Sequence, residues 1–206
     1  MTFGDVPARL LESEFDFRCF FLCRPRIELF RDIDARCESM LERGMLAEVA
    51  ALVHDGVLRE GPEQDDGERA AEKAIGYRQA LDLLHDLRTA SPDPREEDAR
   101  VQTFVREFQA ASRQFVKRQL TWFRSDPTFR WLAAGRDSVV RHEMSLSEPE
   151  FHKLYSCPEE QVAIRLAEEN KESKRALKQY ITKLAIYDNA QSRGRLVYAI
   201  RQAGLL

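Results

Sequence analysis

The sequence contains little that would indicate secretion, a metal centre or a membrane. Its 206 residues include four cysteines, and although Cys19 and Cys23 lie close together, no second cysteine pair or histidine cluster completes a zinc site. We therefore predict no zinc and interpret the cysteines as reduced thiols of an intracellular protein, cytoplasmic or organellar. No apolar run reaches membrane-spanning length, and the acidic N-terminus shows no signal-peptide pattern, so no membrane partner is expected.

A second absence concerns phosphate-binding loops. The dipeptide Gly-Lys occurs nowhere in the chain. The loop of the G-x-x-x-x-G-K-[S/T] kind, whose backbone N–H groups cradle phosphates, is therefore missing from this sequence.

Charge is distributed unevenly along the chain. The net charge is −3, and 43% hydrophobic with 33% charged residues are typical of a soluble, rather polar, helical protein. Residues 170–206 carry eight basic and two acidic side chains, a net charge of +6, which leaves −9 on the remainder. A basic tail on an acidic body indicates a polyanionic partner. The alternative is a solvated helical extension or a hairpin that contacts protein.

Hydrophobic periodicity predicts a mostly helical protein with a few strands. Two aromatic segments are typical of strands in a parallel sheet: Phe15–Cys23 and Thr128–Leu132. Helices are predicted over Ile27–Arg43 (with Gly44 as a left-handed cap), Met45–His54, Tyr77 to about Arg88, and Pro94–Arg124. Towards the C-terminus, helices are predicted to start at Ser147 and at Ser156, the latter running to Tyr187, and a last one covers Asn189–Ala203.

The rest of the chain is organised around Ser112–Arg124 (SRQFVKRQLTWFR), which ends the longest predicted helix. Apolar side chains share one face of that helix: Val101, Phe104, Val105, Phe108, Phe115, Trp122 and Phe123. Nearly opposite, four cations lie within about 40° of each other, and we call them the cation row: Arg106, Arg113, Lys117 and Arg124. Between Phe104 and Arg124 one acid faces five bases. This excess favours phosphate binding, and a solvated helix face is the alternative.

The same stretch resembles the last conserved block of the tRNA dimethylallyltransferases (tRNA isopentenyltransferases). The matching residues are Arg113-Gln114, Lys117-Arg118-Gln119 and Thr121-Trp122-Phe123-Arg124. Two upstream blocks look like further motifs of the family: Lys73-Ala74-Ile75-Gly76-Tyr77-Arg78-Gln79, and Arg36, Met40-Leu41, Gly44-Met45, Glu48-Val49 with Leu52. The three blocks stand in the family's order, and the resemblance covers roughly Phe15–Leu132 but not Arg136–Leu206.

The resemblance implies transfer of a dimethylallyl group from its pyrophosphate to N6 of an adenosine next to the anticodon. It also implies that residues 1–135 are the C-terminal half of a tRNA prenyltransferase-like domain, a nucleotide-kinase-like α/β core with two strands kept. Residues 136–206 match no motif of the family and are expected to form a helical basic extension of unknown role. Dimethylallyl diphosphate is the implied co-substrate, with magnesium, and no cofactor is bound covalently. The implied pyrophosphate contact is Arg36, and the implied contacts to the tRNA anticodon stem-loop are Lys73, Gly76, Arg78, Arg113, Lys117 and Arg118.

Ordinary structural roles remain alternatives for these residues. Arg36 is as consistent with a surface ion pair to Asp32 or Glu38, and Gly76 with a turn that packs closely. Trp122 and Trp131 are expected in the core rather than stacked on bases.

The family's phosphate-binding loop and catalytic base have no counterpart here. We therefore assign no catalytic residue, expect the chain to be a fragment that is inactive alone, and expect its two aromatic strands to leave unpaired, aggregation-prone edges. A non-catalytic RNA-binding module is one alternative. One half of a split enzyme, completed by a separate N-terminal half, is another.

Overall fold

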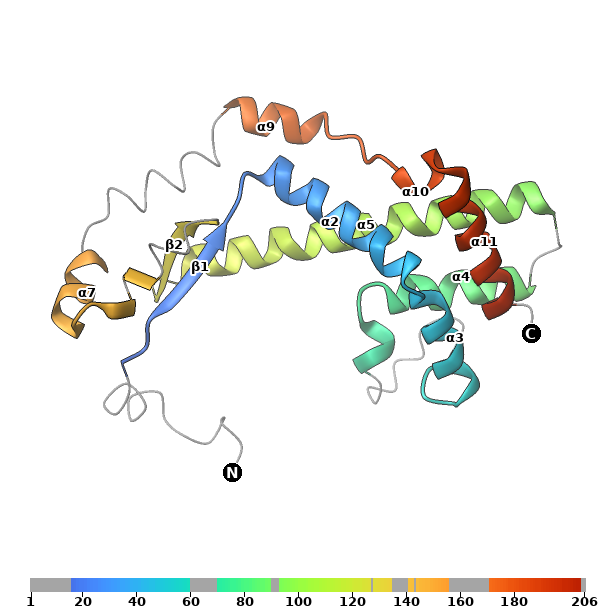
Figure 1. The fold of residues 1–206 in the computed structure, drawn as a ribbon, viewed down its shortest axis with the longest axis horizontal. Coiled ribbons are helices and arrows are strands. Elements are labelled where there is room, and N and C mark those ends of the chain that lie inside the picture. The colour runs from blue at the N-terminus through green and yellow to red at the C-terminus, as the bar shows by residue number, and fades with distance from the viewer. Residues whose placement is uncertain are drawn as a thin grey trace. The chain divides into compact units, whose positions relative to one another are not determined.

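The computed structural model describes residues 16–59, 70–89, 93–126, 128–134, 141–142, 144–155 and 171–204. The chain divides into two units, and Figure 1 labels their helices and strands. Unit 1 comprises Met1–Glu28 and Gln119–Gln179, and unit 2 comprises Leu29–Arg118 and Tyr180–Leu206. The division into residues 1–135 and 136–206 stays a prediction, while in the structure the last residues group with unit 2.

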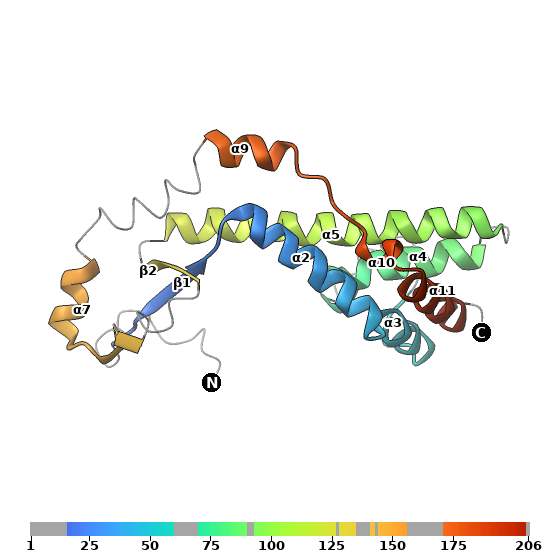
Figure 2. The ribbon, with the colours of Figure 1, turned by 45° about the horizontal axis from the view of Figure 1, so that its top comes forward.

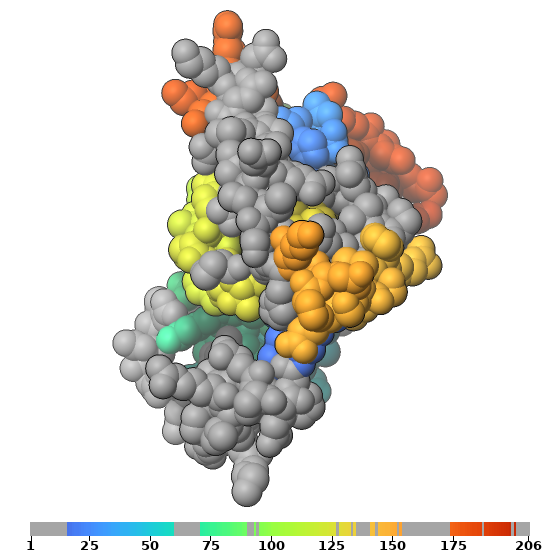
Figure 3. All heavy atoms as spheres, turned by 90° about the vertical axis from the view of Figure 1, so that its left-hand side faces the viewer, coloured from blue at the N-terminus to red at the C-terminus, as the bar shows by residue number. Residues whose placement is uncertain are grey.

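Unit 1 contains a two-stranded parallel sheet. Strand β1 (Cys19–Cys23) pairs with β2 (Phe129–Ala133), with Cys19 opposite Phe129. Both predicted strands are thus confirmed, although β1 begins later than predicted because β2 offers no partner before Phe129. Phe15 lies outside the described residues. Among its described residues, this unit also contains the helices α7 (Glu148–Tyr155), visible at the surface in Figure 3, and α9 (Lys171–Lys178).

Aromatic rings cover one side of this sheet. The Phe21 ring lies 4.5 Å from the rings of Phe123 and Trp131, centroid to centroid. Trp131 is fully buried, which confirms its predicted core position, but the prediction for Trp122 is wrong because 58% of its surface is exposed. Its ring packs edge-on against Phe123 and Phe129 at the outside of the cluster. The apolar face of the long helix therefore ends in a partly exposed aromatic group.

Unit 2 is helical. It contains most of α2 (Arg26–Glu42) and of α5 (Pro94–Ser125), together with α3 (Met45–His54), the 3-10 turn η2 (Ala70–Lys73), α4 (Tyr77–Thr89), α10 (Ala185–Asp188) and α11 (Ala190–Gly204). The bounds of α2, α3, α4, α5 and α11 agree with the predicted helices to within one or two residues, whereas η2 and a separate α10 were not predicted. Gly44 has φ 98°, which confirms the left-handed cap.

The core of unit 2 forms where α3, α4, α5 and α11 meet, α11 lying against α3 and α4 (Figure 2). Val101, Phe104, Val105 and Phe108 line the buried side of α5, as predicted, and Leu196 and Ile200 bring α11 into the same core. Phe115, in contrast, is 44% exposed. Burial of the predicted apolar face is therefore restricted to its first half within this unit.

The predicted helix from Ser156 to Tyr187 does not continue through its last third. Helix α9 ends at Lys178, and residues 180–184 are not helical. The backbone N–H groups of Ala185 and Ile186 donate instead to the Glu38 carboxylate of α2, in place of intrahelical hydrogen bonds. The Tyr180 hydroxyl donates to Asp34 on the same helix. Residues 156–170 lie outside the described part.

Candidate functional site

The cation row on α5 is not uniformly exposed. Arg113 donates from Nη1 to Asp34 Oδ1 on α2, and only 15% and 7% of these two side chains is exposed. Its planar guanidinium also lies over the Tyr180 ring, 5.6 Å from the ring centroid. Arg113 of α5 therefore contacts both α2 and the C-terminal segment, Tyr180–Gly204. Its guanidinium is engaged in an internal ion pair.

Two acids on successive turns of α2 hold that segment. Asp34, which is 5% exposed, also accepts a hydrogen bond of 2.8 Å from the Tyr180 hydroxyl. Glu38, which is 8% exposed, accepts from the N–H groups of Ala185 and Ile186 at 3.0 and 2.9 Å. Gln109 Nε2 on α5 donates to Glu38 Oε1 at 3.2 Å. Both buried carboxylates are thus satisfied, as buried charges must be.

Burial shifts the ionisation of two members of this network. It raises the pKa of Tyr180 to about 12, and the hydrogen bond to Asp34 adds to the shift because the charged carboxylate favours the protonated hydroxyl. Burial also raises the pKa of Glu38 above its ordinary value, although the Ile186 and Ala185 N–H groups oppose this by stabilising the carboxylate.

Tyr180→Phe is expected to lower the free energy of unfolding by about 1–2 kcal/mol, because it removes a hydrogen bond to a charged, buried acceptor. The pKa of Tyr180 is higher in the folded protein, so its stabilisation is fully present below pH 10 and is lost as the pH rises towards about 12. Urea denaturation of both proteins below pH 10 and between pH 10 and 12 measures this. Tyr198→Phe, at a 66% exposed ring, is the control. The same pH dependence with and without Tyr180 would contradict the assignment.

The exposed cations of the organising stretch are Lys117 and Arg118. Lys117 Nζ lies 5.8 Å from the Phe30 ring centroid, and the Arg118 guanidinium lies 5.9 Å from the ring of Phe115. Both side chains belong to unit 2 and are open to solvent. With the exposed Phe115 beside them, they form a positively charged surface that also carries an aromatic ring.

The second group of predicted residues lies at the start of α4. Lys73 is exposed in η2, and the Arg78 guanidinium pairs with Asp82 one turn later at 3.2 Å. Gly76 has φ 97°, and its N–H donates to Gln79 Oε1 at 2.7 Å, which caps the helix. A Cβ at Gly76 would lie 2.8 Å from Phe108 Cε2. The close approach expected at this glycine is therefore made by a core ring of α5.

Arg36 is exposed on α2. One alternative paired it with Glu38, but that carboxylate is occupied by Gln109, Ala185 and Ile186. Arg36 belongs to unit 2, as do Lys73, Gly76, Arg78, Arg113, Lys117 and Arg118. Among them, Arg113 pairs with an acid of another helix, Asp34 of α2, and Arg78 pairs with Asp82 of its own helix.

Sequence reasoning missed Asp34, Glu38, Gln109 and Tyr180. A signal existed for the two acids, because Asp34 shares a helix face with the apolar Phe30, Cys37 and Leu41. An acid on an apolar stripe indicates a buried partner. Nothing in the sequence pairs it with Arg113, which is 79 positions away.

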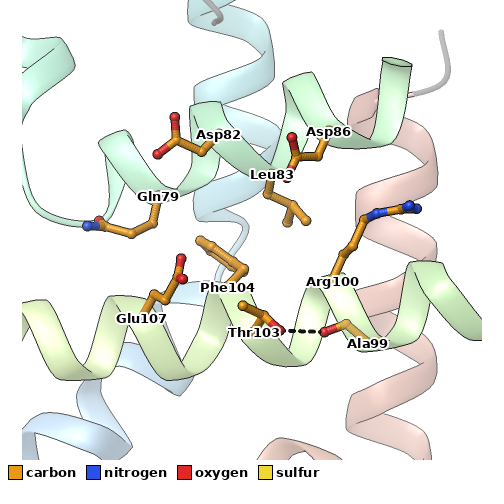
Figure 4. Close-up of a pocket in the computed structure, with 9 residues that line it drawn as sticks. All are labelled: Gln79, Asp82, Leu83, Asp86, Ala99, Arg100, Thr103, Phe104 and Glu107. Carbon is orange, nitrogen blue, oxygen red and sulfur yellow. Dashed lines mark hydrogen bonds between the residues drawn. The ribbon is translucent and has the colours of Figure 1, made fainter. Parts of the chain in front are cut away.

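A cavity of about 240 Å³ lies between α4 and α5. Asp82 and Asp86 of α4 and Arg100 and Glu107 of α5 surround it, with Phe104 below (Figure 4). Three carboxylates against one guanidinium repel phosphate, so we do not assign the pyrophosphate to this cavity.

The described residues contain neither a membrane-spanning helix nor a metal-binding cluster. No helix among them is both long and apolar enough to cross a membrane. They also contain no cluster of three His, Cys, Asp or Glu side chains that would hold a metal ion.

Comparison with known proteins gives the same family as the motifs. The family model for IPP transferase matches residues 4–126. A tRNA dimethylallyltransferase of Protochlamydia amoebophila is 42% identical over 139 residues, which cover 67% of this chain and 36% of the relative. Arabidopsis thaliana tRNA dimethylallyltransferase 9 is 37% identical over 190 residues, 87% of this chain and 38% of the relative. No solved structure matches.

The extent of these matches refines the sequence analysis. The chain spans a little over a third of the length of these two relatives. The Arabidopsis match covers 87% of the chain, so it extends past residue 135, where the motif resemblance ends. Since the family model matches more than half of the sequence, the chain belongs to the IPP transferase family.

Proposed function

We propose that this chain acts in the transfer of a dimethylallyl group from its pyrophosphate to N6 of the adenosine beside the tRNA anticodon, and that it supplies tRNA-binding surface. The observation that carries the proposal is the family match over residues 4–126, together with relatives named tRNA dimethylallyltransferase. The exposed Lys117 and Arg118 and the nearby Phe115 support it, because phosphates and unpaired bases bind such side chains.

The proposed roles divide between RNA and pyrophosphate. Lys73, Arg78, Lys117 and Arg118 neutralise tRNA phosphates, and Gly76 shapes the start of α4 that presents Arg78. Arg113 contributes by holding α2 and α5 together through Asp34, which keeps Lys117 and Arg118 in place. Arg36 clamps the departing pyrophosphate, because a guanidinium stays charged and binds two oxygens at once.

Dimethylallyl diphosphate supplies the transferred group, and the leaving pyrophosphate gains charge as its C–O bond breaks. A cation such as Arg36 stabilises that charge more in the transition state than in the ground state, which lowers the barrier. The resemblance also implies magnesium, but the described residues provide no cluster of ligands that would hold it.

A non-catalytic RNA-binding role is the second candidate. The exposed Lys117, Arg118 and Phe115 favour it, because such side chains bind RNA without a phosphate-binding loop. In this case the purified chain binds RNA but transfers no prenyl group. If it is one half of a split enzyme, transfer begins only when a partner supplies the phosphate-binding loop.

Binding to a fluorescein-labelled anticodon stem-loop RNA tests the common part of both candidates. Lys117→Ala/Arg118→Ala is expected to weaken binding about tenfold at low salt and to reduce the slope of log affinity against log salt by about 1.4–1.8, because two phosphate contacts are lost. Fluorescence anisotropy at several salt concentrations measures both quantities.

The matched control is Arg43→Ala/Arg95→Ala, which removes the same charge at two other exposed positions of unit 2. An equal effect of both double variants would show a general charge effect and contradict the assigned face. Absence of any salt-dependent binding by the folded wild-type chain would contradict the proposed function itself.

A further inference from the structure

The C-terminal segment Tyr180–Gly204 carries positive charge on an ordered frame. Its basic residues are Lys183, Arg193, Arg195 and Arg201, its single acid is Asp188, and α11 contains no acid at all. Most of this segment lies outside any family motif quoted above, and the family model ends at residue 126. Its charge therefore needs an explanation of its own.

The segment is held at both ends. At its start, Asp34 and Glu38 accept hydrogen bonds from Tyr180, Ala185 and Ile186. Further along, Leu196 and Ile200 are 3% and 1% exposed and pack in the core shared with α3 and α4. Arg193 and Arg195 of α11 are thus presented from a fixed position in unit 2 rather than from a loose tail, so little ordering entropy opposes binding.

The outward face of α11 combines a cation with an aromatic ring. At 100° per residue, Gln191, Arg195 and Tyr198 fall within about 60° of each other. Arg195 is exposed, and 66% of Tyr198 is exposed. Arg193 is exposed as well, but it lies about 160° round the helix from Arg195 and does not belong to this face. A guanidinium and a stacking ring on one face are the pair of groups that bind a phosphate and an unpaired base.

This segment also begins beside the cation row. Arg113 of that row lies over the Tyr180 ring, and Lys117 lies over Phe30, whose ring packs against Tyr180 at 5.6 Å. Lys183, three residues after Tyr180, is exposed. Cations of α5 therefore lie beside Tyr180, the residue at which the C-terminal segment begins.

We propose that α11 is a second RNA-contacting surface, in which Arg195 binds a phosphate and Tyr198 stacks on an unpaired base. The inference rests on the proposed function for its partner, an RNA with single-stranded residues, and extends the RNA-binding surface beyond the residues that the family resemblance assigns. The anchor on Asp34 and Glu38 fixes this surface relative to Lys117 and Arg118.

Two variants of the full chain test the proposal with the labelled anticodon stem-loop RNA. Arg195→Ala is expected to reduce the salt slope by about 0.7–0.9, since one phosphate contact is removed. Tyr198→Ala is expected to weaken binding by roughly 5- to 150-fold through loss of one stacked base, whereas Tyr198→Phe keeps the ring and most of the affinity.

The control again removes equal charge elsewhere, with Arg43→Ala at another exposed position, and circular dichroism verifies that each variant is folded. If neither α11 variant changes affinity or slope while Lys117→Ala/Arg118→Ala does, the α11 surface is refuted and the proposed function stands. If Tyr198→Phe weakens binding as much as Tyr198→Ala, stacking is refuted. If the wild-type chain does not bind RNA, both proposals fail together.

Discussion

Asp34→Ala is expected to lower the free energy of unfolding by about 3–5 kcal/mol, because removal of one partner leaves a buried charge without compensation. Asp34 is 5% exposed and accepts from both Arg113 and Tyr180. Its loss leaves the half-buried Arg113 guanidinium facing the Tyr180 hydroxyl, and the C-terminal segment loses its first attachment. Urea denaturation followed by far-UV circular dichroism measures the change.

Asp86→Ala is the matched control, since Asp86 is an exposed aspartate on α4, and it is expected to change stability by about 0.5 kcal/mol or less. The double variant Asp34→Ala/Arg113→Met removes both charges and is expected to recover much of the loss, because no unpaired ion remains buried. A change below about 1 kcal/mol in the single variant would show that the pair is solvated.

The helices of this protein are predictable because their signals are local. Gly44 separates α2 from α3 by a left-handed residue, and the apolar spacing from Val101 to Phe108 defines the buried side of α5. Trp122 shows the limit of this reasoning. It continues the same periodic face, yet it lies where that face packs against only two strands, so its ring is left at the edge.

The candidate site shows the same division between local and distant information. Spacing alone places Arg113 in a row with Lys117, but only the fold brings Asp34 to Arg113. The interruption of the helix before Ala185 has the same origin. The Glu38 carboxylate accepts hydrogen bonds from the Ala185 and Ile186 N–H groups, which a continuous helix would have paired with its own carbonyls. Charges that read as one surface in the sequence are therefore divided into structural and exposed groups.

Gly76→Ala is expected to lower the free energy of unfolding by about 2–4 kcal/mol, from two additive causes. A side chain at φ 97° carries a backbone penalty of about 1–2 kcal/mol. The added Cβ also meets Phe108, at 2.8 Å from Cε2 and 3.1 Å from Cζ, and overpacking of this kind costs about 1–3 kcal/mol. Replacement of glycine restricts the unfolded chain and offsets less than about 1 kcal/mol. Urea denaturation again gives the value.

Gly44→Ala separates the two causes. Gly44 has φ 98°, almost the same as Gly76, but no atom lies within 4 Å of the position of its added Cβ. It is therefore expected to cost only the backbone penalty, and equal losses at the two glycines would contradict the clash with Phe108.

The same glycine distinguishes packing from RNA contact. Gly76→Ala/Phe108→Leu shortens the side chain that the new methyl group meets, and it is expected to cost less than the sum of the two single changes, since neighbouring positions are not additive. If Gly76 affects RNA binding only through the packing of α4, Gly76→Ala weakens binding to the anticodon stem-loop, and the double variant restores affinity together with stability. A variant that is stable but still binds RNA weakly would instead place the Gly76 backbone at the RNA, beside Arg78.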